Sequence, residues 1–124
     1  MSAWLLDTCV LIDLTRRIPA AELAVRTALE QPYVCPVSTM ELFAGARSQR
    51  EEAQVDVVLA TFRQLPIPPE VYRLAGSYLR HFRASHSLSF PDALIAATAE
   101  HHGLRLATLN VKHFPMLPKL KRAY

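Results

Sequence analysis

Three acidic residues stand out because each lies in an otherwise apolar or small-residue stretch: Asp7 in AWLLDTCV, Glu41 in VSTMELFAGA and Asp92 in FPDALIAATA. A carboxylate among apolar residues is costly to bury without a partner. If the fold gathers the three, their mutual repulsion in a low dielectric requires a counter-charge. A hard divalent cation such as Mg²⁺ or Mn²⁺ supplies that charge through oxygen ligands and promotes attack of water on a phosphodiester.

Each acid also has a purely structural interpretation. Asp7 has the position of a helix cap or a turn residue, and Ser38 with Glu41 has the spacing of a capping box. Asp92 falls in the first turn of a predicted helix, where the macrodipole favours any carboxylate. Taken singly, these local roles explain the acids as well as chemistry does. Only their joint position decides, and the fold sets that position.

Short apolar strands alternate with helical patterns along the chain. The pattern predicts strands at 3–6, 33–36, around Ile67 and at 105–109, with a further edge strand in the tail LPKLKRAY. It predicts a helical turn capped by Thr8 and helices at 19–30, from Ser38 or Thr39, and at 49–64, 70–85 and 91–102. We therefore expect an α/β fold: a three-layer α/β/α sandwich with a mostly parallel sheet of four to five strands.

In parallel sheets ligands bind beyond the carboxyl ends of the strands. One acid follows the first predicted strand, another lies on the helix after the second, and the third begins the helix that precedes the last core strand. We expect these acids to meet two hydroxyl residues and an amide at that edge, which in chain order gives Asp7, Thr8, Glu41, Asp92, Thr108 and Asn110. The two threonines are expected to orient the carboxylates.

The composition sets the outer limits. With 124 residues, 51% of them hydrophobic and 20% charged, the chain fits a single folded domain over 1–124. The formal charge of +3 is compatible with a polyanionic partner without being evidence for one. Cys9 and Cys35 form no disulfide framework and have no metal-ligand spacing, and the opening MSAWLLDTCV is neither a membrane span nor a signal peptide. A cytoplasmic protein with no membrane association is expected.

Three segments resemble a known family. LLDTCVLIDL, VSTMELFAGA and PDALIAATAEHHGLRLATLNVKHF, in this order and spacing, resemble PIN-domain ribonucleases, and most closely the VapC-type toxins of bacterial and archaeal toxin–antitoxin modules. The resemblance extends from Trp4 to about Leu117. It implies an Mg²⁺- or Mn²⁺-dependent endoribonuclease, usually a homodimer, that is held inactive by a cognate antitoxin. By position, Asp7, Glu41 and Asp92 match the family's metal-binding acids.

The chain departs from the family pattern after the last core strand. The family often has a fourth acid there, in a TRD-like or a TxNxxDF-like segment. This sequence reads TLNVKHF instead, with Asn110 at one such place and His113 at the other. Three carboxylates balance one divalent ion more readily than two, so we expect one tightly held cation with a neutral oxygen from Asn110. His113 is expected at the surface; within the site, its imidazole would shift the preference toward Mn²⁺.

Basic side chains near the acids are candidates for contact with RNA phosphates. Arg16, Arg17 and Lys112 flank the acidic residues in sequence, although long basic side chains often only solvate a surface. Asp13 is expected in a surface or capping role. Adjacent helical residues point about 100° apart, so His101 and His102 are not expected to chelate a metal.

Two other functions are considered, and the residues argue against the second. Loss of the fourth acid is compatible with a catalytically weak or silent PIN-like module that mainly engages a partner protein or RNA. An aspartyl-phosphate phosphatase would need a second acid two positions after Asp7, where Cys9 stands, and this argues against that function.

One set of apolar residues has two interpretations: either it forms core, or it forms a face for a second copy or an antitoxin helix. Core packing is the default interpretation of Leu42–Phe43, Val55, Val58, Leu59 and Phe62.

Overall fold

A computed structural model describes residues 3–124 and places a parallel sheet at their centre. The strands follow one another in the spatial order β3-β2-β1-β4, and every neighbouring pair is parallel. In register, Leu6 of β1 lies between Val34 of β2 and Ala107 of β4. The strands are β1 (Trp4–Leu6), β2 (Pro32–Val34), β3 (Arg63–Gln64) and β4 (Arg105–Ala107).

The helices that connect these strands begin and end at recognisable signals. Proline occupies a first-turn position in several of them, where its missing N–H is not needed. Ser48 and Ser89 cap α4 and α6, and Gly103 ends α6 in the left-handed conformation, with φ 66°. The helices are α1 (Thr8–Thr15), α2 (Pro19–Thr27), α3 (Pro36–Gly45), α4 (Gln49–Thr61), α5 (Pro69–His86) and α6 (Phe90–His102), followed by a 3₁₀ turn, η1 (Val111–His113).

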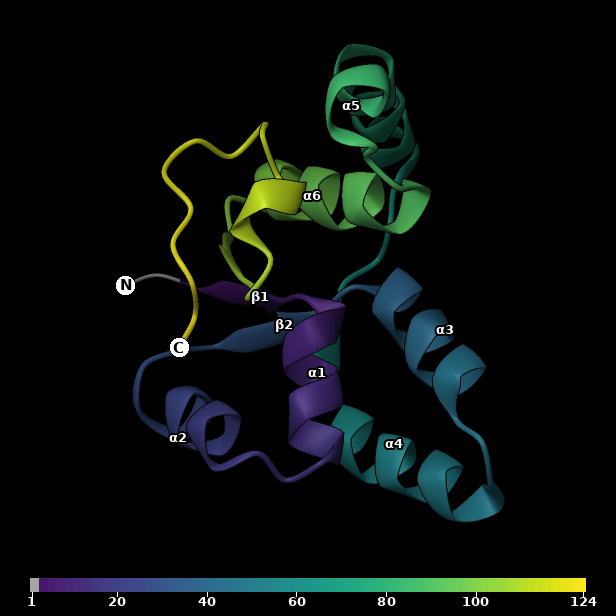
Figure 1. Ribbon diagram of the computed structural model, residues 1–124, viewed down its shortest axis with the longest axis vertical. Helices are drawn as coiled ribbons and strands as arrows, with labels where there is room; N and C mark the ends of the chain where they lie inside the picture. The colour runs from purple at the N-terminus through teal and green to yellow at the C-terminus, as the bar shows by residue number, and fades with distance from the viewer. Residues whose placement is uncertain (1–2) are drawn as a thin grey trace.

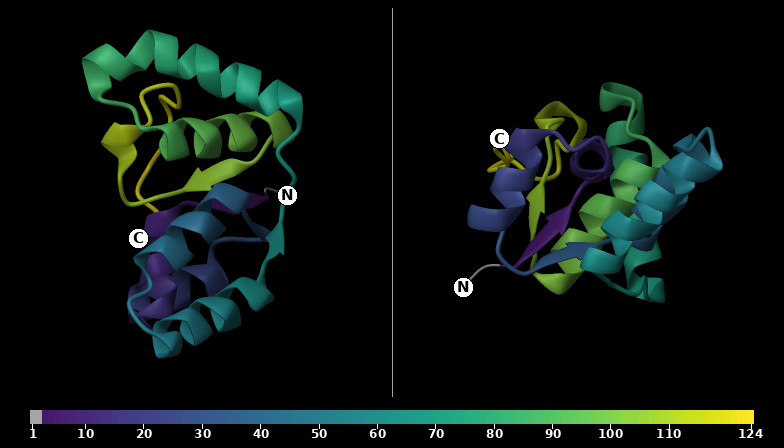
Figure 2. Two further views of the ribbon diagram at one scale, coloured as in Figure 1. Left: turned by 90° about the vertical axis from the view of Figure 1, so that its right-hand side faces the viewer. Right: turned by 90° about the horizontal axis from the view of Figure 1, so that it is seen from below.

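Helices cover both faces of the sheet (Figures 1 and 2). Leu6, Val34 and Ala107 point to one face and pack with buried residues of α1, α2 and α4. Their strand neighbours Leu5 and Leu106 point to the other face and pack with α6, on which α5 lies. This alternation follows from the two-residue period of strands. The predicted three-layer α/β/α sandwich with a parallel sheet is therefore confirmed.

Two predicted strands are wrong in position or extent. The third strand is Arg63–Gln64 rather than the segment around Ile67, because backbone pairing with β2 ends where the prolines begin. Ile67 instead packs against the helices of the α5/α6 layer. The predicted tail strand is reduced to one parallel bridge between Thr108 and Arg122.

Two predicted helix starts are also wrong. α1 is capped by Asp7 rather than by Thr8, which is its first residue. α3 begins at Pro36, directly after β2, so Ser38 lies inside the helix and does not cap it. The pyrrolidine ring of a proline at the first helical position fixes a helical φ, and this starts the helix earlier than the hydroxyl residues suggest.

The apolar stretches of α3 and α4 serve the core. Leu42 and Val55 are buried, at 5% exposure each. The other four residues, Phe43, Val58, Leu59 and Phe62, are partly buried and pack against the same cluster beneath the sheet. Core packing, the default interpretation of these residues, is confirmed. Both cysteines are free thiols, as the sequence suggested.

Candidate active site

Asp7 lies at the carboxyl end of β1. With Glu41 and Asp92 it belongs to the set of three acids that we call the acidic edge. Its carboxylate Oδ1 accepts from the backbone N–H of Thr8 at 2.8 Å, so the residue caps α1. Its Oδ2 accepts from the hydroxyl of Thr108 at 2.6 Å and from the thiol of Cys9 at 3.4 Å. With 4% exposure, Asp7 is a buried carboxylate whose orientation is fixed by three donors from two elements.

Cys9 was not among the sequence candidates, although it stands two positions after Asp7. Its Sγ also lies 3.6 Å from the Thr108 hydroxyl and accepts from the backbone N–H of Leu109. Burial and the neighbouring Asp7 charge raise the pKa of this thiol to about 11. Cys9 therefore remains protonated at neutral pH and acts as a weak donor to the carboxylate, not as a nucleophile.

Glu41 projects from the middle of α3 toward the start of α1. Its Oε1 accepts from the Thr8 hydroxyl at 2.6 Å, and the same hydroxyl lies 2.8 Å from that of the fully buried Ser38. The capping-box interpretation of Ser38 and Glu41 is thus wrong, since neither residue caps α3. Thr8 contacts both acids, Asp7 through its backbone N–H and Glu41 through its hydroxyl, and joins them in one network.

Asp92 is in the first turn of α6, as predicted, and its backbone N–H donates to the Ser89 hydroxyl at 3.2 Å. Burial raises the pKa of the Asp92 carboxyl, and the negative charges of Asp7 and Glu41 raise it further. The Ser89 hydrogen bond and the nearby His113 act in the opposite direction. Asp92 is thus within the electrostatic reach of both other acids.

The residues after β4 include a buried, hydrogen-bonded side chain and several exposed ones. The Thr108 hydroxyl is buried and also accepts from the backbone N–H of Asn110 at 2.9 Å. The amide side chain of Asn110 is exposed, and within residues 3–124 it makes no hydrogen bond. His113 is exposed, as predicted, yet its Nδ1 lies 3.5 Å from Oδ2 of Asp92, so it reaches the acidic edge. Lys112, on η1, is exposed as well.

The remaining candidates are explained by other contacts. Arg17 pairs with Glu22 at 2.7 Å, whereas Arg16 lines a cavity beside α1. Asp13 accepts from the phenol of Tyr124 at 2.7 Å, a contact that the sequence did not suggest. The rings of His101 and His102 lie edge to face at the end of α6, and His102 contacts the backbone of Pro66.

The acidic edge fits a divalent cation by its chemistry. Asp7, Glu41 and Asp92 offer hard carboxylate oxygens, and no lysine or arginine within residues 3–124 forms an ion pair with any of them. Burial raises the pKa of Asp92 most, and the nearby Asp7 and Glu41 carboxylates raise it further, so a cation at this edge would offset unfavourable negative charge. The side chains do not form a complete coordination site: in the described chain, no group of three His, Cys, Asp or Glu is close enough together to hold a metal. A cation drawn there would complete its coordination with water or substrate oxygens.

Comparison with known proteins places this geometry in a family. The PIN domain model matches residues 4–118, nearly the whole described chain. The chain belongs to the PIN domain family. This PIN domain is 42% identical over 120 residues to Ribonuclease VapC10 of Mycobacterium tuberculosis, covering 94% of this chain and 90% of the relative.

Two further comparisons agree with the assignment. Ribonuclease VapC19 of Mycobacterium tuberculosis is 32% identical over 124 residues, covering 97% of this PIN domain and 98% of the relative. A solved toxin–antitoxin complex from Klebsiella pneumoniae superposes with a TM-score of 0.80 at 32% identity, over 99% of this chain and 98% of that one. The resemblance inferred from the three sequence segments is confirmed. None of the helices within residues 3–124 combines the length and apolarity that a membrane crossing requires.

Proposed function

We propose that this PIN domain is a metal-dependent endoribonuclease of the VapC type, which hydrolyses RNA phosphodiester bonds in the cytoplasm as the toxin of a toxin–antitoxin pair. The observation that carries the proposal is the network in which Thr8 joins Asp7 to Glu41, with Asp92 in their electrostatic field. It lies in a PIN domain, and relatives that match it over nearly their whole length are named ribonucleases.

Asp7, Glu41 and Asp92 would hold Mg²⁺ or Mn²⁺, with Asn110 as a neutral oxygen donor nearby. When bound, the cation supplies Lewis acidity toward the scissile phosphate and the attacking water. Thr108 and Cys9 keep Asp7 in one orientation, and Thr8 does the same for Glu41. A site whose ligands are oriented beforehand pays less of its binding free energy for their ordering.

The RNA substrate follows from the site chemistry and the names of the relatives. An acidic edge that holds a divalent cation would accommodate a phosphodiester, and the proposed phosphate contacts are Arg16, Arg17 and Lys112. Of these, Arg16 carries the strongest support because it lines the cavity that also includes Glu41. Arg17 is already engaged by Glu22, which lowers its availability to a phosphate.

A cognate antitoxin and a second copy of the chain are the proposed protein partners. The support is the solved neighbour described as a toxin–antitoxin complex, which matches this chain over 99% of its length. Co-purification of a tagged chain with the product of an adjacent small reading frame tests the antitoxin, and light scattering of the isolated protein tests the homodimer.

The decisive experiment compares Asp92→Asn with Asp56→Asn. Asp56 is an exposed acid on α4, away from the acidic edge, so it controls for the loss of one charge. Purified wild type and Asp56→Asn should cleave RNA when Mg²⁺ or Mn²⁺ is added, while Asp92→Asn should not, with unchanged circular dichroism. Cleavage by Asp92→Asn at the wild-type rate contradicts the proposal. If the wild-type protein neither binds metal nor cleaves RNA, the alternative of a catalytically silent module is supported instead.

A further inference from the structure

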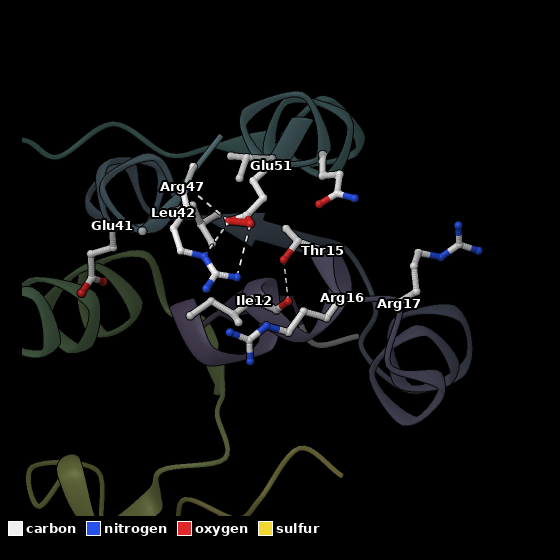
Figure 3. A pocket seen from close by; sticks show the side chains of 12 residues that line it. Ile12, Thr15, Arg16, Arg17, Glu41, Leu42, Arg47 and Glu51 are labelled. Atoms are coloured by element: carbon white, nitrogen blue, oxygen red, sulfur yellow. Dashed lines mark hydrogen bonds and ion pairs between the residues drawn. The ribbon is translucent and has the colours of Figure 1, made fainter. Parts of the chain in front are cut away.

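A cavity of about 510 Å³ lies between α1, α3 and α4, and its lining extends to Glu41 (Figure 3). Its charged lining residues are three arginines and two glutamates. Arg16 and Arg17 come from the end of α1, while Arg47 and Glu51 come from the turn after α3 and the start of α4. The cavity thus places cationic side chains from separate elements beside an acid of the proposed catalytic centre.

Arg47 is largely exposed, and Glu51 orients one edge of its guanidinium. The backbone N–H of Arg47 donates to Oε1 of Glu51 at 3.1 Å, its Nε donates to the same oxygen at 3.4 Å, and its Nη2 lies 3.4 Å from Oε2. These contacts use the Nε side of the guanidinium and leave its Nη1 side open. A carboxylate that fixes one edge of an arginine presents the other edge for an anion.

Arg16 points into the same space from the opposite side. Arg16 and Arg47 line one cavity, and in Figure 3 both guanidinium groups turn toward it, whereas the Arg17 side chain extends away. Within the described chain, Arg16 makes no ion pair or side-chain hydrogen bond. Hydrogen bonds from Arg47 lower the pKa of Glu51 most, and the charges of Arg47 and Arg16 lower it further. Because these two guanidinium groups share one carboxylate, the net charge of the three side chains is positive.

Glu41 connects this cavity to the acidic edge. It is a lining residue of the cavity, and its Oε1 accepts from Thr8, which also contacts Asp7. In Figure 3 the Glu41 carboxylate turns away from the two arginines, so it lies at the margin of the cavity and apart from its cationic side chains. An extended ligand that places one phosphate at the acids has a path along the cavity for a neighbouring phosphate.

We infer that Arg16 and Arg47 form a phosphate-binding subsite that holds the RNA strand on one side of the scissile bond. The inference rests on the proposed function for its substrate, although the cavity itself does not depend on the metal. A single-stranded RNA carries one negative charge per nucleotide, and guanidinium forks match phosphate oxygens in a bidentate geometry. Arg47 is preorganised by Glu51 and Arg16 is free to close on the ligand. Both would position the RNA backbone, and neither is among the acids proposed to hold the metal.

The test measures RNA binding with EDTA present, so that neither metal nor cleavage enters the result. Fluorescence anisotropy with a labelled single-stranded RNA gives Kd across a salt series for wild type, Arg16→Gln, Arg47→Gln and the double variant. Arg80→Gln is the matched control, because Arg80 is an exposed arginine on α5, in the opposite layer. Arg16→Gln and Arg47→Gln should each weaken RNA binding by about tenfold. Each should also lower the slope of log K against log salt by about 0.7, the value for one lost phosphate contact on a single strand. Arg80→Gln should change neither.

Lysine variants separate charge from geometry. Arg16→Lys and Arg47→Lys keep the charge but lose the fork, so they should restore the salt slope and only part of the affinity. Unchanged Kd and slope in the double glutamine variant, with a wild-type thermal unfolding curve, overturn the inference. It is equally overturned if that variant binds RNA normally but no longer retains a co-purified partner protein, because the cavity is then a protein-docking site. If wild type shows no metal-dependent cleavage while the arginine-dependent slope remains, the nuclease proposal fails and the subsite stands.

Discussion

Thr108 donates its hydroxyl hydrogen to Oδ2 of Asp7 at 2.6 Å, although 101 residues separate the two in sequence. The contact is possible because β1 and β4 are parallel neighbours, so their carboxyl ends reach the same edge. Asp7 is 4% exposed and Thr108 is fully buried, so water does not compete for this bond. The orientation of the first acid is thus set by the far end of the domain.

Thr108→Val tests this contact. Valine keeps the shape but removes the donor, so a buried carboxylate loses its shortest side-chain hydrogen bond. We expect a loss of about 2 kcal/mol in the free energy of unfolding, together with weaker Mn²⁺ binding. Urea unfolding and isothermal titration measure the two effects. Thr61→Val, which removes an exposed hydroxyl on α4, should change both by far less.

Thr8 offers a second test, because its hydroxyl alone links Glu41 to the start of α1. Thr8→Ser keeps that hydroxyl and should retain RNA cleavage near the wild-type rate. Thr8→Val removes it, frees Glu41 to adopt other rotamers and should lower the cleavage rate by about tenfold, a typical effect of lost support around a metal ligand. Equal rates in the serine and valine variants would show that Glu41 needs no such support.

Asp92 makes a pH-dependent prediction in the absence of metal. Its pKa is raised in the folded state, so its contribution to stability is fully present below the ordinary pKa of 3.8 and is lost as pH rises through the higher folded value. Asp92→Asn should therefore match wild type in strong acid and exceed it at neutral pH, by on the order of 1 kcal/mol. Thermal unfolding in EDTA from acid to neutral pH measures the difference. Added Mn²⁺ should reverse the order, because it stabilises the wild type more.

Asn110→Asp restores a fourth acid at one of the two places where the family often has it. The added charge should tighten Mn²⁺ binding, since more carboxylates offer a divalent cation more compensation. Isothermal titration gives the change in Kd, with Asn110→Ser as the variant that adds no charge. If aspartate and serine bind Mn²⁺ equally, Asn110 lies too far from the cation to act on it.

Tyr124 ties the end of the described chain to α1 through its hydrogen bond to Asp13. Burial, followed by the Asp13 carboxylate, raises the pKa of the Tyr124 phenol well above its usual value, so it stays a donor throughout the physiological range. Tyr124→Phe should cost about 1 kcal/mol of unfolding free energy. Asp13→Asn retains an acceptor and should cost less. Tyr33→Phe, at a tyrosine whose phenol makes no hydrogen bond in the described chain, is the control for urea unfolding.

The layer order and the acidic edge were predictable because they depend on long-range periodicity. Short apolar runs alternating with helices fix a parallel sheet, and parallel strands bring Asp7 and Thr108 to one edge. The roles of the acids as metal ligands stay predictions. Predictions of individual contacts were less reliable. The spacing of Ser38 and Glu41 fits a helix cap, but the helix begins earlier, at Pro36.

Other features lacked a sequence signal. β3 consists of two exposed polar residues, Arg63 and Gln64, whose strand geometry comes from pairing with β2 and not from an apolar pattern. The Arg47–Glu51 pair has an ordinary helical spacing, so its place opposite Arg16 becomes visible only when α1 and α4 pack together. In the sequence, Cys9 served only to argue against a phosphatase, because it stands where that mechanism needs an acid. The structure gives its thiol a role as a donor to Asp7.

The parallel bridge between Thr108 and Arg122 connects the last described residues to the residue that orients Asp7. The backbone N–H of Ala123 donates to the carbonyl of Thr108, and the Thr108 hydroxyl holds Asp7. Asp7, Glu41 and Asp92 all precede β4, so a chain truncated before residue 105 carries the three acids without the strand and the hydroxyl that align Asp7. The order of assembly therefore follows from topology: the acidic edge forms only after segments about a hundred residues apart in sequence have paired.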